Sequence, residues 1–118
     1  MVNAGYIANS TIAHNSIHRL SYDGIQFGWG WGQDTFAGAV TVANNSIDGV
    51  LGYHADGGNI YSQSPMHNST ITGNWLQHDG NRYGMIYTDG ASEISIADNV
   101  LNHGNVRCAA VPSDIAVF

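Results

Sequence analysis

The stretch Ile96-Ala97-Asp98-Asn99-Val100-Leu101 is the last of four copies of one short pattern in this chain. The earlier copies are Ile12-Ala13-His14-Asn15-Ser16-Ile17, Val42-Ala43-Asn44-Asn45-Ser46-Ile47 and Ile71-Thr72-Gly73-Asn74-Trp75-Leu76. Their central asparagines, at positions 15, 45, 74 and 99, are separated by 30, 29 and 25 residues. Internal repeats of about 20 to 50 residues are typical of solenoids, propellers and arrays, so the pattern predicts a repeat architecture.

The copies agree at several positions beside the asparagine. A hydroxyl residue lies four positions before it, a β-branched apolar residue three positions before it, and Ile or Leu two positions after it. A short apolar segment rich in β-branched residues predicts a strand that enters a corner. A helix is excluded, because no segment keeps an apolar stripe at helical spacing and Gly and Asn interrupt every window.

A second apolar segment follows three of the copies, at Gly24–Phe27, Asn59–Ser62 and Met85–Thr88. Each repeat therefore carries at least two short strands, which is typical of a parallel β-helix whose coils stack at about 4.8 Å. We expect an all-β fold over residues 1–118, formed by a single parallel β-helix unit (a solenoid) of about four to five coils.

The asparagine column has a physical role in such a fold. Asn tolerates left-handed backbone angles at a corner, and its side-chain amide can bond the amide of the Asn one coil away. The pattern therefore predicts an asparagine ladder of satisfied buried groups. The alternative is that each Asn only terminates its own turn.

The composition of the chain argues against several kinds of binding partner. The chain has no Lys, three arginines and a net charge of −6, so a nucleic acid or an anionic membrane has no electrostatic support as a partner. No stretch approaches the roughly 18 apolar residues of a membrane span, and the single Cys108 excludes an internal disulfide. His78 and His103 both follow a repeated Asn by four positions, but polar turn residues explain them, so we expect no metal and no cofactor.

The repeats begin within the first dozen residues and leave no room for a polar cap, which solenoids need at their ends. We therefore expect a slice of a longer solenoid, or a unit that self-associates through exposed coil ends. The localisation stays open, with a secreted or periplasmic location considered as part of a longer protein.

Three segments carry a resemblance to a known group of proteins. Residues 15–32 resemble the run N-x-I-H-x-x-x-Y-x-G-I-x-x-G-W-G-W-G of right-handed parallel β-helix proteins related to glycoside hydrolases, including fucosidase-like and xylanase-like members. Residues 56–61 are similar to their D-G-G-x-I-Y segment, and residues 87–92 to their Y-x-D-(D/E)-G-S-S segment, although only one acidic residue stands here. The resemblance implies a right-handed β-helix that acts on a polysaccharide or oligosaccharide.

The resemblance points to Asp56 and Asp89 as catalytic residues. Glycoside cleavage normally needs two carboxyl groups, one that protonates the leaving oxygen and one that acts as base or nucleophile. A straight strand would hold these two aspartates too far apart, so a corner at Gly57-Gly58 or at Gly84 is required. The alternative is that each Asp caps its own turn, since Asp-Gly is a common turn dipeptide.

Five further residues are candidates for substrate binding: Trp29, Trp31, Tyr61, Arg82 and His54. The two tryptophans alternate with glycines, so an extended segment would project both indoles to one side, where they suit the apolar face of a sugar ring. The alternative is that the indoles fill or cover the solenoid.

Tyr61 shares a predicted column with Tyr87, and we expect their rings to stack. In the same register Arg82 lies beside Asp56 on the next coil, where its guanidinium would lower the pKa of that carboxyl. The function expected is hydrolysis of glycosidic bonds, and the alternative is a non-catalytic carbohydrate-binding or structural β-helix fragment.

Overall fold

The computed structural model describes residues 1–30, 36–79, 83–109 and 116–117. This part of the chain is built from short strands and their connections, without a helix. It therefore contains no helical segment long and apolar enough to cross a membrane.

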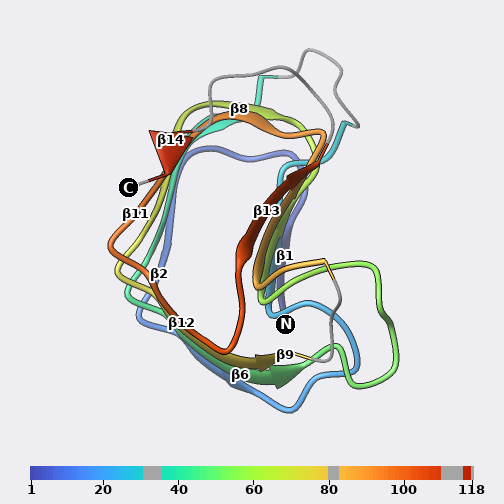
Figure 1. Cartoon of the computed structure of the whole chain (residues 1–118). Helices are drawn as coiled ribbons and strands as arrows, with labels where there is room; N and C mark the ends of the chain where they lie inside the picture. The colour runs from blue at the N-terminus through green and yellow to red at the C-terminus, as the bar shows by residue number, and fades with distance from the viewer. Residues whose placement is uncertain (31–35, 80–82, 110–115, 118) are drawn as a thin grey trace.

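The strands form three sheets, and every strand pair is parallel. Sheet A contains, in spatial order, β1 (Val2–Ala4), β4 (Ile25–Phe27), β7 (Ile60–Ser62), β10 (Ile86–Asp89) and β13 (Val106–Ala109). Sheet B contains β14 (Ala116–Val117), β11 (Ser92–Ala97), β8 (Pro65–Thr72), β5 (Gly38–Ala43) and β2 (Ala8–Ala13). Sheet C contains β12 (Val100–Asn102), β9 (Trp75–Asp79), β6 (Ser46–Val50) and β3 (Ser16–His18). Equivalent strands of successive repeats lie behind one another in Figure 1, an arrangement consistent with a β-helix-like solenoid.

The register of the strands follows the sequence repeat. In sheet B, Val42 is the partner of Ile12 on one side and of Ile71 on the other. In sheet A, Ile60 is the partner of both Ile25 and Ile86, so the second predicted strand of each repeat is also confirmed. Each repeat contributes one strand to each sheet, because its three apolar segments must all face the same interior.

The core lies between the three sheets and consists of the inward columns of these strands. Ile25, Ile60 and Ile86 are fully buried, and Ile47 and Leu76 are fully buried on sheet C. Burial of such a side chain stabilises the fold by about 1.5 to 3 kcal/mol. The alternation of apolar and polar residues therefore decides which face of each strand points inward.

The repeated asparagines are hydrogen-bonded to one another. Nδ2 of Asn15 donates to Oδ1 of Asn45 (2.8 Å), Asn45 donates to Asn74 (2.9 Å), and Asn74 donates to Asn99 (2.9 Å). Each accepting Oδ1 also receives the backbone N–H of the donating Asn at 3.0 Å. Burial of these amides is tolerated, because their polar atoms find partners.

The left-handed backbone angles lie one residue earlier than expected. They belong to the residues that precede the four asparagines, namely His14 (φ 58°), Asn44 (φ 54°), Gly73 (φ 65°) and Asp98 (φ 55°). The expectation that the asparagines themselves take this conformation was wrong. The corner turns before each Asn, and this leaves its N–H and its side-chain amide free to reach the next Asn.

Candidate active site on the outer face of sheet A

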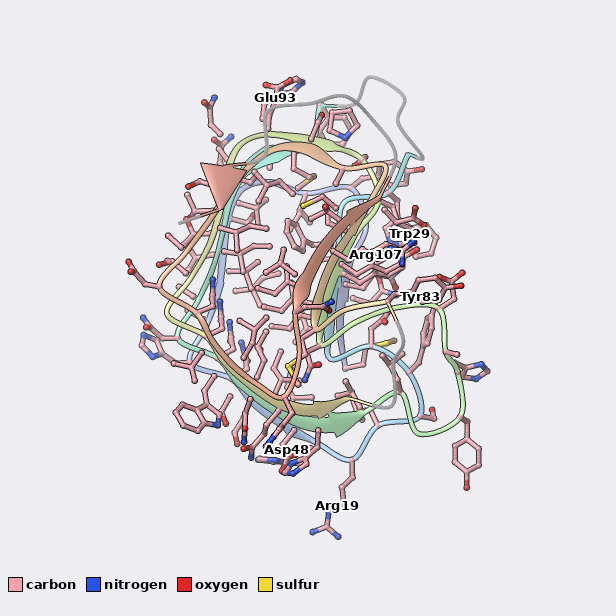
Figure 2. The ribbon with its side chains drawn as sticks, viewed as in Figure 1. Arg19, Trp29, Asp48, Tyr83, Glu93 and Arg107 are labelled. Atoms are coloured by element: carbon pink, nitrogen blue, oxygen red, sulfur yellow. The ribbon has the colours of Figure 1, made fainter. Side chains whose placement is uncertain are left out.

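The outward-facing side chains of sheet A form one column across the coils. Its members are partners in register from strand to strand: Asn3, Gln26, Tyr61, Tyr87 and Arg107. Since neighbouring residues of a strand point to opposite faces, this column lies outside the core. Figure 2 shows Trp29, Tyr83 and Arg107 on the same outer side of the sheet.

Three tyrosines and an arginine stack on this face. The rings of Tyr61 and Tyr87 lie 5.1 Å apart at an angle of 23°, which confirms the predicted stack. Tyr83 stacks on Tyr87 at 5.3 Å, and Cζ of Arg107 lies 5.0 Å from the centre of the Tyr83 ring. Tyr61 and Tyr87 are only 1% and 5% exposed, so these two rings pack within the protein and offer little open surface.

A chain of hydrogen bonds leads along this face to Asp89, at the end of β10. Nε2 of Gln26 donates to Oε1 of Gln63 (3.4 Å), and Nε2 of Gln63 donates to the hydroxyl of Tyr61 (2.9 Å). The Tyr61 hydroxyl donates in turn to Oδ2 of Asp89 (3.0 Å). The half-buried Asp89 carboxyl is thereby oriented by a network that begins two coils earlier, at Gln26 of β4.

Asp56 and His54 lie in the segment between β6 and β7, which extends outward beside sheet A in Figure 1. Both residues are exposed. The backbone bends at Asp56 and again at Asn59, so Asp56 is not joined to β7 by a straight strand.

Hydrogen bonds hold this loop against residues 20–22. The N–H of Leu51 donates to the carbonyl oxygen of Tyr22 (3.0 Å), and the N–H groups of Tyr53 and His54 donate to Ser21 (3.2 Å each). The His54 ring meets the Tyr22 ring edge-on at 5.3 Å. His54 therefore helps to seat the loop that carries Asp56.

The negative charges of Asp56 and Asp89 affect the pKa values of the same three tyrosines. Burial is the largest cause that raises the pKa of Tyr22, of Tyr61 and of Tyr87, and both carboxylates raise each of these pKa values further. For Tyr87 the result is a pKa of about 12. Both carboxylates therefore lie close enough to the three rings for their negative charges to disfavour ionisation of each phenol.

Asp23 is a buried carboxyl that the sequence did not single out. It is 0% exposed, its Oδ1 accepts the N–H of Gly58 (2.9 Å), and its Oδ2 has no hydrogen-bond partner among the described residues. Burial raises the pKa of Asp23 to about 7; the Gly58 hydrogen bond opposes this shift and the charge of Asp56 adds to it. In the sequence, Asp23-Gly24 is an ordinary turn dipeptide, and its proximity to Gly58 depends on the stacking of coils.

Trp29 is the other sequence-predicted site residue on this side. The residue is 38% exposed and its indole packs over the Cα of Gly5, while the backbone N–H of Trp29 donates to the carbonyl oxygen of Gly5 (3.1 Å). Gly28 adopts a left-handed φ of 73°, so the expected extended segment is broken at this residue. Trp31 and Arg82 lie outside the described residues. The alignment of the two indoles and the contact of Arg82 with Asp56 therefore stay predictions.

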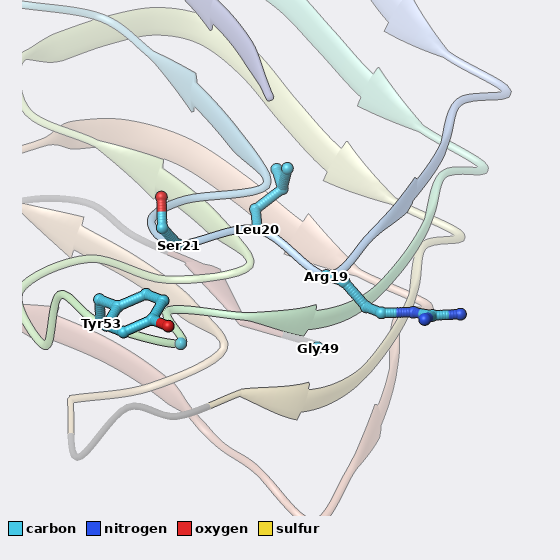
Figure 3. A pocket seen from close by; sticks show the side chains of 6 residues that line it. Arg19, Leu20, Ser21, Gly49 and Tyr53 are labelled. Carbon is cyan, nitrogen blue, oxygen red and sulfur yellow. The ribbon is translucent and has the colours of Figure 1, made fainter.

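A separate depression of about 510 Å³ lies on the other side of the same loop. It is lined by Arg19, Leu20, Ser21, Gly49, Gly52 and Tyr53. Figure 3 shows the Arg19 side chain pointing away from Tyr53, so the two do not converge on one ligand. Among the described residues, no carboxyl group lines this depression to supply the acid and base of a glycosidase.

His78 and His67 each contact a nearby carboxyl group. Nδ1 of His78 lies 2.9 Å from Oδ1 of Asp48, and Nδ1 of His67 lies 2.6 Å from Oε2 of Glu93. Within the described ranges, no three His, Cys, Asp or Glu side chains are grouped closely enough to hold a metal ion.

Comparisons with known proteins leave the family open. No family model matches the chain, and neither a curated protein nor a solved structure matches it.

Proposed function

We propose that this chain is a carbohydrate-active, right-handed parallel β-helix, with the repeated asparagines as its ladder. In this proposal Asp56 and Asp89 cleave a glycosidic bond of a polysaccharide or oligosaccharide.

One observation carries the proposal. Asp56 and Asp89, which are 33 residues apart in the sequence, both lie close enough to Tyr61 and Tyr87, on the outer face of sheet A, for their charges to raise the pKa values of these tyrosines. Glycoside hydrolysis requires two carboxyl groups that flank one glycosidic bond. The resemblance of residues 56–61 and 87–92 to β-helix hydrolases points to the same pair.

The surroundings of the two carboxyl groups favour different roles. Asp89 accepts the hydroxyl hydrogen of Tyr61, so it is held as an acceptor and suits the base or nucleophile. Asp56, on the exposed loop, is then the other carboxyl group of the pair. The exposed part of the Trp29 indole supplies an apolar face for a sugar ring. Trp31, Arg82 and His54 complete the proposed binding set, and the buried Tyr61 supports it by orienting Asp89.

The test is a hydrolysis screen over aryl glycosides and plant polysaccharides, run with the wild-type protein and with Asp56→Asn and Asp89→Asn. We expect each variant to lose at least a hundredfold in kcat/KM, about the contribution of a general acid or base. Asp98→Asn is the matched control, because Asp98 is exposed and lies at the corner between sheets B and C. Undiminished turnover by either site variant would remove that residue from the mechanism.

A second candidate function, non-catalytic carbohydrate binding, is favoured by the outer face of sheet C. Trp75 is 49% exposed there, and its Nε1–H donates to Oε1 of Gln77 (3.2 Å), which fixes the indole. Gln77 is also the register partner of Asp48, so polar groups lie beside the ring. If Trp75→Ala abolishes retention on a polysaccharide column while Asp56→Asn and Asp89→Asn leave it unchanged, this function replaces hydrolysis.

Self-association through the coil ends is also proposed. At one end β1, β2 and β3 are the outermost strands of their sheets, and at the other end these are β13, β14 and β12. Outermost strands present unpaired N–H and C=O groups that can pair with another chain. Light scattering after size exclusion, repeated over a range of concentrations, would detect such association as a rise in mass.

A further inference from the structure

We propose that Asp23 is a positioning residue, which in its neutral carboxylic acid form holds the loop of residues 51–58 closed and so places Asp56 at the site. The role of Asp56 rests on the proposed function. The closure of the loop by Asp23 stands independently of it.

The geometry around Asp23 is a cradle formed by two consecutive glycines. The N–H of Gly58 donates to Oδ1 of Asp23. A Cβ on Gly57 would overlap the same carboxyl oxygen, and a Cβ on Gly58 would lie 2.9 Å from the carbonyl oxygen of Ile60. Glycine at position 57 lets the end of the loop approach the carboxyl group so closely, and glycine at position 58 leaves room for the carbonyl oxygen of Ile60.

The remaining contacts explain how one side chain acts on the whole loop. Residues 51–54 are already bonded through their backbone N–H groups to residues 20–22, directly before Asp23. Asp23 adds an attachment at the Gly57-Gly58 end, where the N–H of Gly24 also donates to the carbonyl oxygen of Gly58 (3.4 Å), and Asp56 immediately precedes these glycines. Loss of the Asp23 hydrogen bond therefore loosens the end of the loop beside Asp56.

The burial of Asp23 selects its neutral form. Oδ2 is shielded from solvent and has no hydrogen-bond partner within the described residues, so a charge there would be neither solvated nor paired. Among the described residues, the titratable groups near it are Asp56 from the loop and Tyr22, which directly precedes Asp23 and whose ring meets that of His54. Of these, Asp56 further disfavours a second negative charge, and together with burial it raises the pKa of Asp23 to about 7.

The direction of the pH effect follows from linkage. In the closed loop Asp23 holds its proton up to about pH 7, whereas in an open, solvated loop it would titrate near its ordinary value of 3.8. Between these two values the open form binds fewer protons, so the opening constant rises by up to about tenfold per pH unit. Above about pH 7 the opening constant no longer changes with pH.

Hydrogen exchange measures this opening directly in the wild-type protein. We expect protection factors of the amides of residues 51–58, corrected for intrinsic exchange, to fall by at least tenfold between pH 5 and pH 8. Val40 and Val42, in the buried strand β5, are the internal reference for global unfolding.

Two variants sharpen the test. Asp23→Asn keeps an oxygen that accepts from Gly58 but cannot ionise, so the protection of its loop is expected to be independent of pH. Asp98→Asn removes an exposed carboxyl elsewhere and is expected to follow the wild type. An equal pH dependence in wild type and Asp23→Asn, or none in the wild type, would overturn the proposal.

The activity profile separates this inference from the proposed function. If hydrolysis is found, Asp23→Asn is expected to shift the alkaline limb of kcat/KM to higher pH, which a purely structural role would not do. If no sugar is hydrolysed but loop protection depends on pH as described, the loop closure stands and the catalytic role of Asp56 fails.

Discussion

The hydroxyl of Tyr61 donates a hydrogen bond of 3.0 Å to Oδ2 of Asp89, across the boundary between two coils. The same hydroxyl accepts a hydrogen bond from Nε2 of Gln63 (2.9 Å). Tyr61 therefore links the buried polar chain of sheet A to a carboxyl group that is half exposed. The column that contains the stacked rings of Tyr61 and Tyr87 therefore also orients the carboxyl group of Asp89, a candidate catalytic residue.

Tyr61→Phe keeps the stacked ring and removes only the hydroxyl. We expect it to lower the free energy of unfolding by about 1 to 3 kcal/mol, because the Gln63 amide loses its acceptor in a buried position. Urea denaturation measures this change. Tyr53→Phe is the control, since Tyr53 is 90% exposed and its hydroxyl is in water; an equal loss in both variants would contradict the prediction.

Asn45→Ala breaks the asparagine column in its middle. It removes the Oδ1 that accepts both the N–H and the Nδ2 of Asn15, and it removes the Nδ2 that donates to Oδ1 of Asn74 and to the carbonyl oxygen of Ile12. Since each unsatisfied buried group costs about 1 to 3 kcal/mol, we expect a loss of at least about 3 kcal/mol or a failure to fold. Asn102→Ala, on the outward column of β12, should change the denaturation midpoint little.

Gly57→Ala tests the cradle of Asp23 without a change of charge. The added methyl group would overlap Oδ1 of Asp23, so we expect a thermal midpoint several degrees lower and a loss of about 1 to 3 kcal/mol. Gly52 belongs to the same loop, and a Cβ there would meet only the carbonyl oxygen of Leu20 at an ordinary 3.5 Å. Gly52→Ala should therefore unfold at nearly the wild-type temperature.

The global stability should depend on pH through Asp23. Its pKa is raised from 3.8 to about 7 in the folded protein, so the folded state retains a proton that the unfolded state has lost. The free energy of unfolding should thus be highest near pH 4, before other carboxyl groups become protonated, and fall by up to about 4 kcal/mol as the pH rises to about 7. Denaturation curves at several pH values check this, and in Asp23→Asn this decline should be absent.

Ile60→Ala addresses the core column of sheet A. Ile60 is fully buried between Ile25 and Ile86, so the cavity should cost about 2 to 5 kcal/mol. Val100→Ala, at a position that is 47% exposed, should stay within about 0.5 kcal/mol of the wild type. Comparable losses in the two variants would mean that Ile60 does not belong to a tightly packed interior.

The repeat itself was sufficient to predict the strands, their parallel pairing and the stack of Tyr61 on Tyr87. These features depend on residues in equivalent positions of successive repeats, and such positions can be counted along the chain. The prediction placed the left-handed corner residue one position too late, at the Asn itself. The preceding residue takes this conformation, because the amide groups of the Asn must reach the neighbouring coil.

The contacts of the candidate site were less predictable from the sequence than the fold, because they depend on the tertiary structure. Asp23 and Gly58 are 35 residues apart and occupy different sequence patterns, so no spacing rule predicts their hydrogen bond. The alternation of apolar and polar residues in the repeat determined by itself which side chains face the core, because burial follows directly from strand periodicity. Only the tertiary structure decided which polar groups outside the core meet, because the loops between strands differ in length and are placed by contacts with other coils.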